Sequence, residues 1–152
     1  MININHDHPS HIENIGPFSI YVLSSDVAYP PREDFNFIEI ISGDHIVPLV
    51  GSPTILNRVN ANLFVATPET DFAWIDGFDV AEGDRLNVYA LGFTTEEEVL
   101  ARAHSWMVDA PYTGTVVLQL AENTEIRLGG MTLEQFAMNA RGILDFTPLD
   151  LS

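Results

Sequence analysis

The chain of 152 residues contains no cysteine and no lysine, and it has few positive charges of any kind. Without cysteine, a disulfide, a thiol nucleophile and a thiolate metal site are all excluded. Six arginines stand against 22 acidic residues, which gives a net charge of −16. This charge repels phosphate backbones and anionic membrane surfaces, so we expect no direct binding to nucleic acid or to a membrane.

Long apolar runs are also missing from the sequence. No stretch approaches the roughly 20 apolar residues of a membrane span, and the first residues lack the basic and apolar regions of a secretory signal. We therefore expect a cytoplasmic protein, located in the host cytoplasm if a phage encodes it. The hydrophobic content of 46% is sufficient for a core. We predict a polar N-terminal arm at 1–16 and a single domain at 17–152.

Runs rich in β-branched and aromatic residues predict strands along most of the chain. The expected strands are 18–23, 35–41, 45–50, 63–66, 72–75, 85–92, 115–120, 125–128 and 143–149. The second and third of these are expected to form a β-hairpin through Ser42-Gly43-Asp44. A short helix is expected at 54–62, and the sequence shows no internal repeat.

Two capping boxes predict where helices begin. In a capping box, a Thr side chain and the side chain of an acid or amide three residues later each accept a hydrogen bond from the other residue's backbone N–H. They are formed by Thr95 with Glu98 and by Thr132 with Gln135. Apolar residues at helical spacing extend the first helix through Trp106 and Met107, and Gly142 is expected to end the second.

The elements expected between residues 85 and 149 follow the order β-α-β-β-α-β, which is the split ferredoxin-like order. We therefore predict an α+β fold: a mainly antiparallel β-sheet with two α-helices, whose C-terminal part has this ferredoxin-like order. Such a fold carries many unrelated functions, so function has to be argued from particular residues.

Motifs for chemistry are scarce. His6, His8 and His11 with Glu13 form the one cluster of metal-ligand types. They are the basis of one alternative, a metal-dependent enzyme, but a polar terminus offers no support to orient the rings. The acidic loop 76–84 does not match the EF-hand pattern, and no nucleophile elbow or phosphate loop occurs. We assign no catalytic residue, no metal and no cofactor.

The acidic residues are concentrated in one part of the chain. The segment 69–98 contains nine acids and one arginine, so its net charge is −8, half that of the whole chain. If the expected strand 85–92 lies near a sheet edge, carboxylates at its two ends would span about 20–25 Å and imitate a nucleic-acid backbone. The candidate partner-binding residues are Asp71, Asp76, Asp79, Glu82, Asp84, Glu96, Glu97 and Glu98.

These features favour a small acidic, non-enzymatic binding or inhibitor protein. We expect a nucleic-acid mimic from a phage or mobile element, of the anti-defence or immunity type, that blocks a basic nucleic-acid-binding enzyme. Aromatic anchors for that partner are expected at Phe72, Trp74 and Phe78, with a place in the core as an equal alternative for Trp74. Two alternatives stay open: a structural or assembly subunit of a homo-oligomer, such as a virion component, and a protein that sequesters a small molecule.

Overall fold

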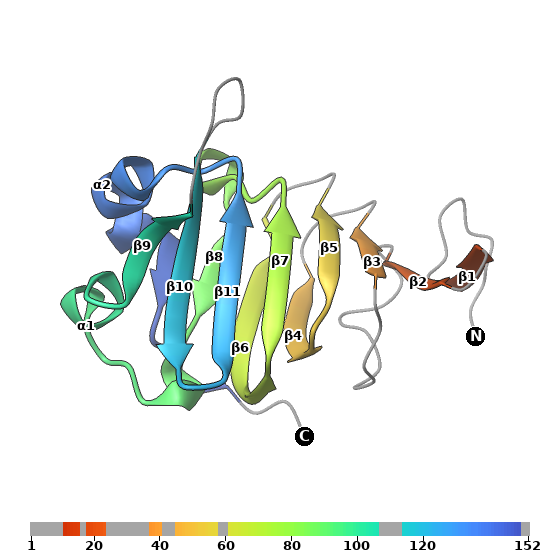
Figure 1. Cartoon of the computed structure of the whole chain (residues 1–152), viewed down its shortest axis with the longest axis horizontal. Coiled ribbons are helices and arrows are strands. Elements are labelled where there is room, and N and C mark those ends of the chain that lie inside the picture. The colour runs from red at the N-terminus through yellow and green to blue at the C-terminus, as the bar shows by residue number, and fades with distance from the viewer. Residues whose placement is uncertain are drawn as a thin grey trace.

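The computed structural model describes residues 11–15, 18–23, 37–40, 45–57, 61–106 and 114–149. Its strands form two sheets with the hydrophobic core between them (Figure 1). The large sheet contains, in spatial order, β1 (His11–Ile15), β2 (Phe18–Leu23), β3 (Phe37–Ile40), β5 (Thr54–Asn57), β7 (Phe72–Asp76), β11 (Thr124–Gly129), β10 (Thr115–Ala121) and β9 (Ala103–Trp106). The small sheet contains β12 (Leu144–Asp145), β8 (Arg85–Asn87), β6 (Leu63–Thr70) and β4 (Ile46–Gly51).

From β3 to β8 the chain alternates between the two sheets, so that each turn adds one strand to each. Neighbouring strands from successive turns are parallel and in register. Phe37 pairs with Thr54 on the next turn, and Thr54 pairs with Trp74 on the turn after that. The architecture is therefore a two-sheet β-solenoid, in which each turn contacts its neighbours.

Apolar side chains stack from turn to turn because the strands are in register. In the large sheet the buried stack consists of Ile38, Ile55, Ile75, Leu128 and Val116. In the small sheet it consists of Val47, Phe64, Leu86 and Leu144. Both stacks face the space between the sheets, and their burial supplies the main apolar contribution to stability.

A second, polar stack runs along one corner of the solenoid. His45, Asn62 and Asp84 each immediately precede a strand of the small sheet, and all three are buried. The His45 backbone N–H donates to the side-chain oxygen of Asn62 (3.0 Å), and the Asn62 backbone N–H donates to Asp84 (2.8 Å). Because every step joins one turn to the next, this stack fixes the spacing of the turns.

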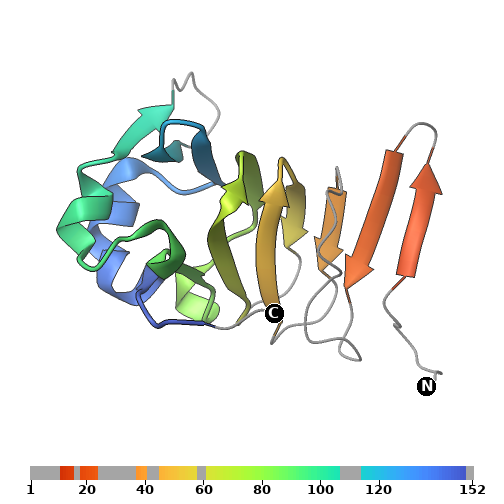
Figure 2. The same cartoon turned by 90° about the horizontal axis from the view of Figure 1, so that it is seen from below.

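Helices and the strands around them cover one end of the solenoid, and β1 and β2 lie at the other end (Figure 2). The helical elements are η1 (Val80–Glu82), η2 (Tyr89–Leu91), α1 (Glu96–Leu100) and α2 (Leu133–Ile143). Both predicted capping boxes are confirmed, at Thr95 for α1 and at Thr132 for α2. Helix α2 buries Phe136, Ala140 and Ile143 on its way from β11 to β12.

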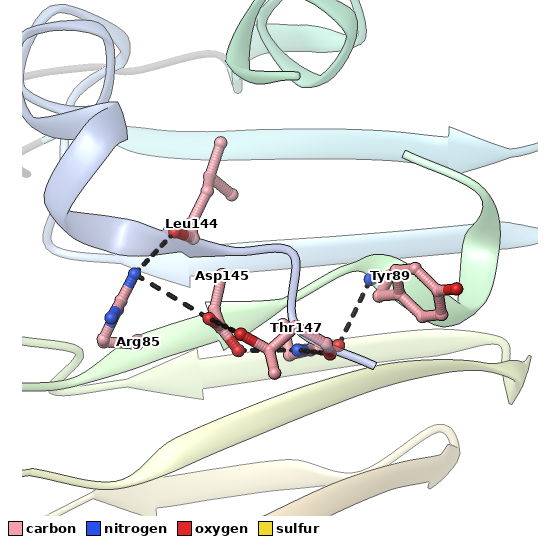
Figure 3. Close-up of polar contacts among 6 residues, drawn as sticks. Arg85, Tyr89, Leu144, Asp145 and Thr147 are labelled. Carbon is pink, nitrogen blue, oxygen red and sulfur yellow. Dashed lines mark hydrogen bonds and ion pairs between the residues drawn. The ribbon is translucent and has the colours of Figure 1, made fainter. Parts of the chain in front are cut away.

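The last strand is held by a polar network around Asp145 (Figure 3). The side-chain amide of Asn87 donates to the Asp145 carboxylate (2.6 Å) and to the backbone carbonyl of Thr147 (2.8 Å). The Arg85 guanidinium donates to the backbone carbonyl of Leu144 (2.8 Å) and lies 4.0 Å from Asp145. These bonds attach the short strand β12 to β8.

The predicted fold class is wrong, since the small sheet is wholly parallel and the large sheet is mixed. The ferredoxin-like order fails as well, because β8 and β12 belong to the small sheet whereas β9, β10 and β11 belong to the large one. The apolar runs of β4 and of the first half of β6, residues 63–66, are nearly continuous, as is typical of parallel strands buried on both faces. The stacked turns repeat one arrangement of strands in space, although the sequence shows no internal repeat.

Several predicted elements are corrected too. The expected hairpin is absent because β3 and β4 lie in different sheets, and the helix expected at 54–62 contains strand β5. The first helix ends at Leu100, so Trp106 belongs to strand β9. Helix α2 continues through Gly142 to Ile143. Within the described ranges, no helix is long and apolar enough to span a membrane.

Gly77 provides a test of the turn after β7. Its φ is +93°, and an added Cβ would lie 2.3 Å from the backbone oxygen of Asn57. We expect Gly77→Ala to lower the free energy of unfolding by at least about 3 kcal/mol, because strain and a backbone clash add. Gly92 has a φ of +90° and open space around it, so Gly92→Ala is expected to cost only about 1 kcal/mol. Urea denaturation of both variants checks this, and equal losses would contradict the clash.

Candidate functional site

The outer face of the large sheet carries a group of aromatic side chains around one arginine. Along β7, Ala73 and Ile75 point into the core, so Phe72 and Trp74 point outward. Arg127 on β11 is directly beside Trp74, and Trp106 comes from β9. We call Phe72, Trp74, Trp106 and Arg127 the aromatic cluster.

The guanidinium of Arg127 holds the aromatic cluster together. Its central carbon lies 4.6 Å from the ring centroid of Phe72, 4.8 Å from that of Trp106 and 5.8 Å from that of Trp74. These distances are within the range of cation–π attraction. The two indoles meet edge to face, with centroids 5.7 Å apart. Glu125 accepts from the Arg127 Nε at 2.6 Å, so the arginine's charge is balanced locally.

The cluster is accessible although its side chains contact one another. Phe72 is 37% exposed and Trp106 is 42% exposed, which is unusual for large aromatic residues. Gly129 makes room for Trp74, because a Cβ there would lie 3.1 Å from the indole Nε1. Aromatic rings locked against an arginine lose little side-chain entropy on contact with a partner, so this surface is suited to recognition.

Two of the three predicted aromatic anchors lie in this cluster. Phe72 and Trp74 face outward as the prediction required, whereas Phe78 is buried against the ring of Phe64. Sequence reasoning missed Trp106, which it placed on a helix, and Arg127, which it did not single out. The alternation of Glu125 and Arg127 with buried residues on β11 was the signal that both point outward.

The structure separates the predicted acidic residues into different roles. Asp71, Asp76, Glu82 and Glu97 are exposed. Glu96 lies 3.8 Å from the Arg141 guanidinium. Glu98 accepts hydrogen bonds from Thr94 and Thr95, which lower the pKa of its carboxyl. Asp79 and Asp76 line one cleft beside β7.

The expected row of carboxylates along an edge strand is not formed. Strand β8 is short, Arg85–Asn87, and lies between β6 and β12 in the small sheet, so it is not at an edge. A strand of this length spans only about 10 Å. The prediction that these carboxylates bind a partner remains untested, but the geometry proposed for nucleic-acid mimicry is absent from this strand.

Asp84 is fully buried and serves the fold. Its carboxylate accepts from the Asn57 side chain (2.6 Å), the Asn62 backbone N–H (2.8 Å) and the Asp79 backbone N–H (3.0 Å). Burial raises the pKa of Asp84, and the neighbouring Asp79 carboxylate adds to the rise, while the three hydrogen bonds oppose it. This residue is therefore a structural element of the polar stack.

Within the described ranges, no group of three or more His, Asp or Glu side chains is arranged to hold a metal ion. The predicted cluster at His6, His8 and His11 lies outside the side chains that the structure describes. Comparison of the chain with protein-family models, with curated proteins and with solved structures finds no match in any of the three. Function therefore has to be inferred from the geometry of this chain alone.

The role of Asp84 leads to a pH-dependent prediction. The pKa of Asp84 is raised in the folded state above its unfolded value of about 3.9. The folded state therefore binds the proton more tightly than the unfolded chain, which stabilises the fold at acid pH. This contribution is lost as the pH rises through the folded-state pKa. We expect Asp84→Ala to lower the free energy of unfolding by about 3 kcal/mol near pH 4, close to the unfolded pKa, through three unpaired donors, and by less at pH 7.5.

Urea denaturation at both pH values measures this difference. Glu82→Ala is the matched control, because Glu82 is an exposed acid in the same loop, and its loss is expected to change stability by about 0.5 kcal/mol or less. A cost of Asp84→Ala that grows with pH would contradict the raised pKa.

Proposed function

We propose that this chain is a non-enzymatic binding protein that holds a basic protein partner on the outer face of its large sheet. The single observation that carries the proposal is the aromatic cluster, in which three outward-facing rings surround Arg127. Tryptophan and arginine are enriched in the residues that dominate binding energy at protein interfaces. An exposed cluster of these types on a rigid sheet is suited to such an interface.

The surrounding charge favours a basic partner. Asp71 and Asp76 flank the cluster at the two ends of β7, and both are exposed. Glu125 balances Arg127, so the carboxylates determine the local charge. The net charge of −16 adds long-range attraction for a positively charged surface and speeds encounter. The partner class that we propose is a nucleic-acid-binding protein, because its working surface carries Lys and Arg.

The test compares capture of proteins from native host lysate by three forms of the chain: wild type, Phe72→Ala/Trp106→Ala, and Met138→Ala. Met138 is a matched control because it is 78% exposed on α2, outside the cluster. We expect a basic protein to be retained by wild type and by Met138→Ala. Removing two anchors is expected to weaken its measured affinity by at least about 30-fold.

The purified partner is then titrated against each form by calorimetry at low and at high salt. Affinity is expected to fall at high salt, since charge contributes to the encounter. Equal affinity of the double variant and wild type, with both folded by urea denaturation, would contradict the proposal.

The stacked turns favour one second candidate, a structural or assembly subunit of a homo-oligomer. Within the described residues, β4 has a strand beside it on one side only, and a parallel sheet can continue at such an edge. Light scattering of the purified chain separates the two: a monomer or dimer is expected for the binding protein, and a large closed oligomer would favour assembly.

A further inference from the structure

A cleft of about 420 Å³ lies beside the aromatic cluster, where β7 and β11 end and α2 begins. Asp76 belongs to both regions, because it follows Trp74 on the outward face of β7 and also lines the cleft. An atom at the Cβ position of Gly129 would lie 3.1 Å from the Trp74 Nε1 and 3.4 Å from the Asp76 Oδ1. The opening of the cleft is thus next to the tryptophan.

The cleft combines apolar and polar walls. Phe78, Val80 and Met131 supply its apolar lining, and Phe78 and Met131 are nearly fully buried. The polar lining comes from Asp76, Asp79, Gln135 and Asn139. A cleft with an apolar interior and acidic groups at its margin matches a side chain that has an aliphatic stem and a cationic head.

The hydrogen bonds of the polar residues leave acceptors available. The Asp79 Oδ1 accepts from the backbone N–H of Ala81, which leaves its other oxygen without a partner among the described residues. The Asn139 side-chain N–H donates to the backbone carbonyl of Gln135, and no described residue donates to its side-chain oxygen. Neither Asp76 nor Asp79 forms an ion pair with any described residue. The cleft can therefore still bind a hydrogen-bond donor that carries a positive charge.

We propose that the cleft receives a lysine or arginine side chain of the basic partner, while the aromatic cluster packs against the residues around it. The aliphatic stem lies against Phe78, Val80 and Met131, and the charged head binds the carboxylates of Asp76 and Asp79. This inference rests on the proposed function and adds to it a specificity pocket for one cationic residue.

The test uses a small probe, so it does not require the partner. Nα-acetyl-arginine amide is titrated into ¹⁵N-labelled protein, with the uncharged isostere Nα-acetyl-citrulline amide as its control. We expect saturable shifts at the backbone amides of Gly77 and Gly130 and at the side-chain amide of Asn139, with a dissociation constant in the millimolar range. Citrulline is expected to bind at least about fivefold more weakly, because it lacks the charge. Equal binding of both probes, or shifts spread evenly over acidic surfaces, would overturn the proposal.

Charge-neutral variants separate the cleft from the general acidity of the chain. Asp76→Asn/Asp79→Asn removes both carboxylates but keeps a residue that caps η1, since asparagine is an equally good N-cap. Glu122→Gln/Glu134→Gln is the matched control, with the same change in net charge at exposed sites outside the cleft and the aromatic cluster. We expect the first variant to bind the arginine probe at least tenfold more weakly than wild type. The affinity of the control variant is expected to stay within twofold of wild type. Equal losses would show nonspecific attraction only and overturn the site.

The two proposals fail in different experiments. If the Phe72→Ala/Trp106→Ala variant keeps its partner, the proposed docking face is wrong, whatever the probe does. If the partner needs the aromatic cluster but the probe is not bound at Asp76 and Asp79, the docking face stands and the pocket is wrong.

Discussion

The buried carboxylate of Asp84 connects three separate passes of the chain, and the geometry of the solenoid depends on it. It binds the side chain that ends β5, the backbone that precedes β6 and the loop that follows β7. Hydrophobic stacking favours any parallel arrangement of these strands, whereas these hydrogen bonds select one register. The same carboxylate shapes the loop from Gly77 to Gly83, which presents Asp79 to the cleft. Structural burial and candidate function are therefore linked through one residue.

Local features of the fold could be predicted from the sequence, because their causes lie within a few residues. The capping boxes at Thr95 and Thr132 are such cases, since each is formed by a side chain and a backbone three positions apart. Strand pairing is determined by contacts between distant segments, and alternation along a strand does not reveal which sheet it joins. The repeat stayed hidden because successive turns differ in length: the turn from Ile46 to Leu63 is shorter than the turn from Leu63 to Arg85.

The candidate site was predicted only in part, for the same physical reason. Phe72 and Trp74 were recognisable as aromatic residues near the acidic segment, and their outward orientation follows from alternation with Ala73 and Ile75. Trp106 was assigned to the wrong type of element, because a helical spacing of apolar residues continued past the point where α1 ends. The contact between Trp106 and Arg127 requires the strand order β11, β10, β9 in the large sheet. No local sequence pattern specifies that order.

The division of the acidic residues explains why net charge alone is a poor guide to function. Asp84 and Glu98 are committed to buried or capping hydrogen bonds, and Glu125 is committed to Arg127. What distinguishes Asp76 and Asp79 is their position at an amphipathic cleft, next to exposed rings that have no role in the core. Exposed aromatic side chains on a sheet that already has a complete core lower solubility, which is why the proposal of a partner rests on these rings rather than on the net charge. The large sheet is thus the wall of the core on one face and, on its other face, the surface to which the proposed recognition is assigned.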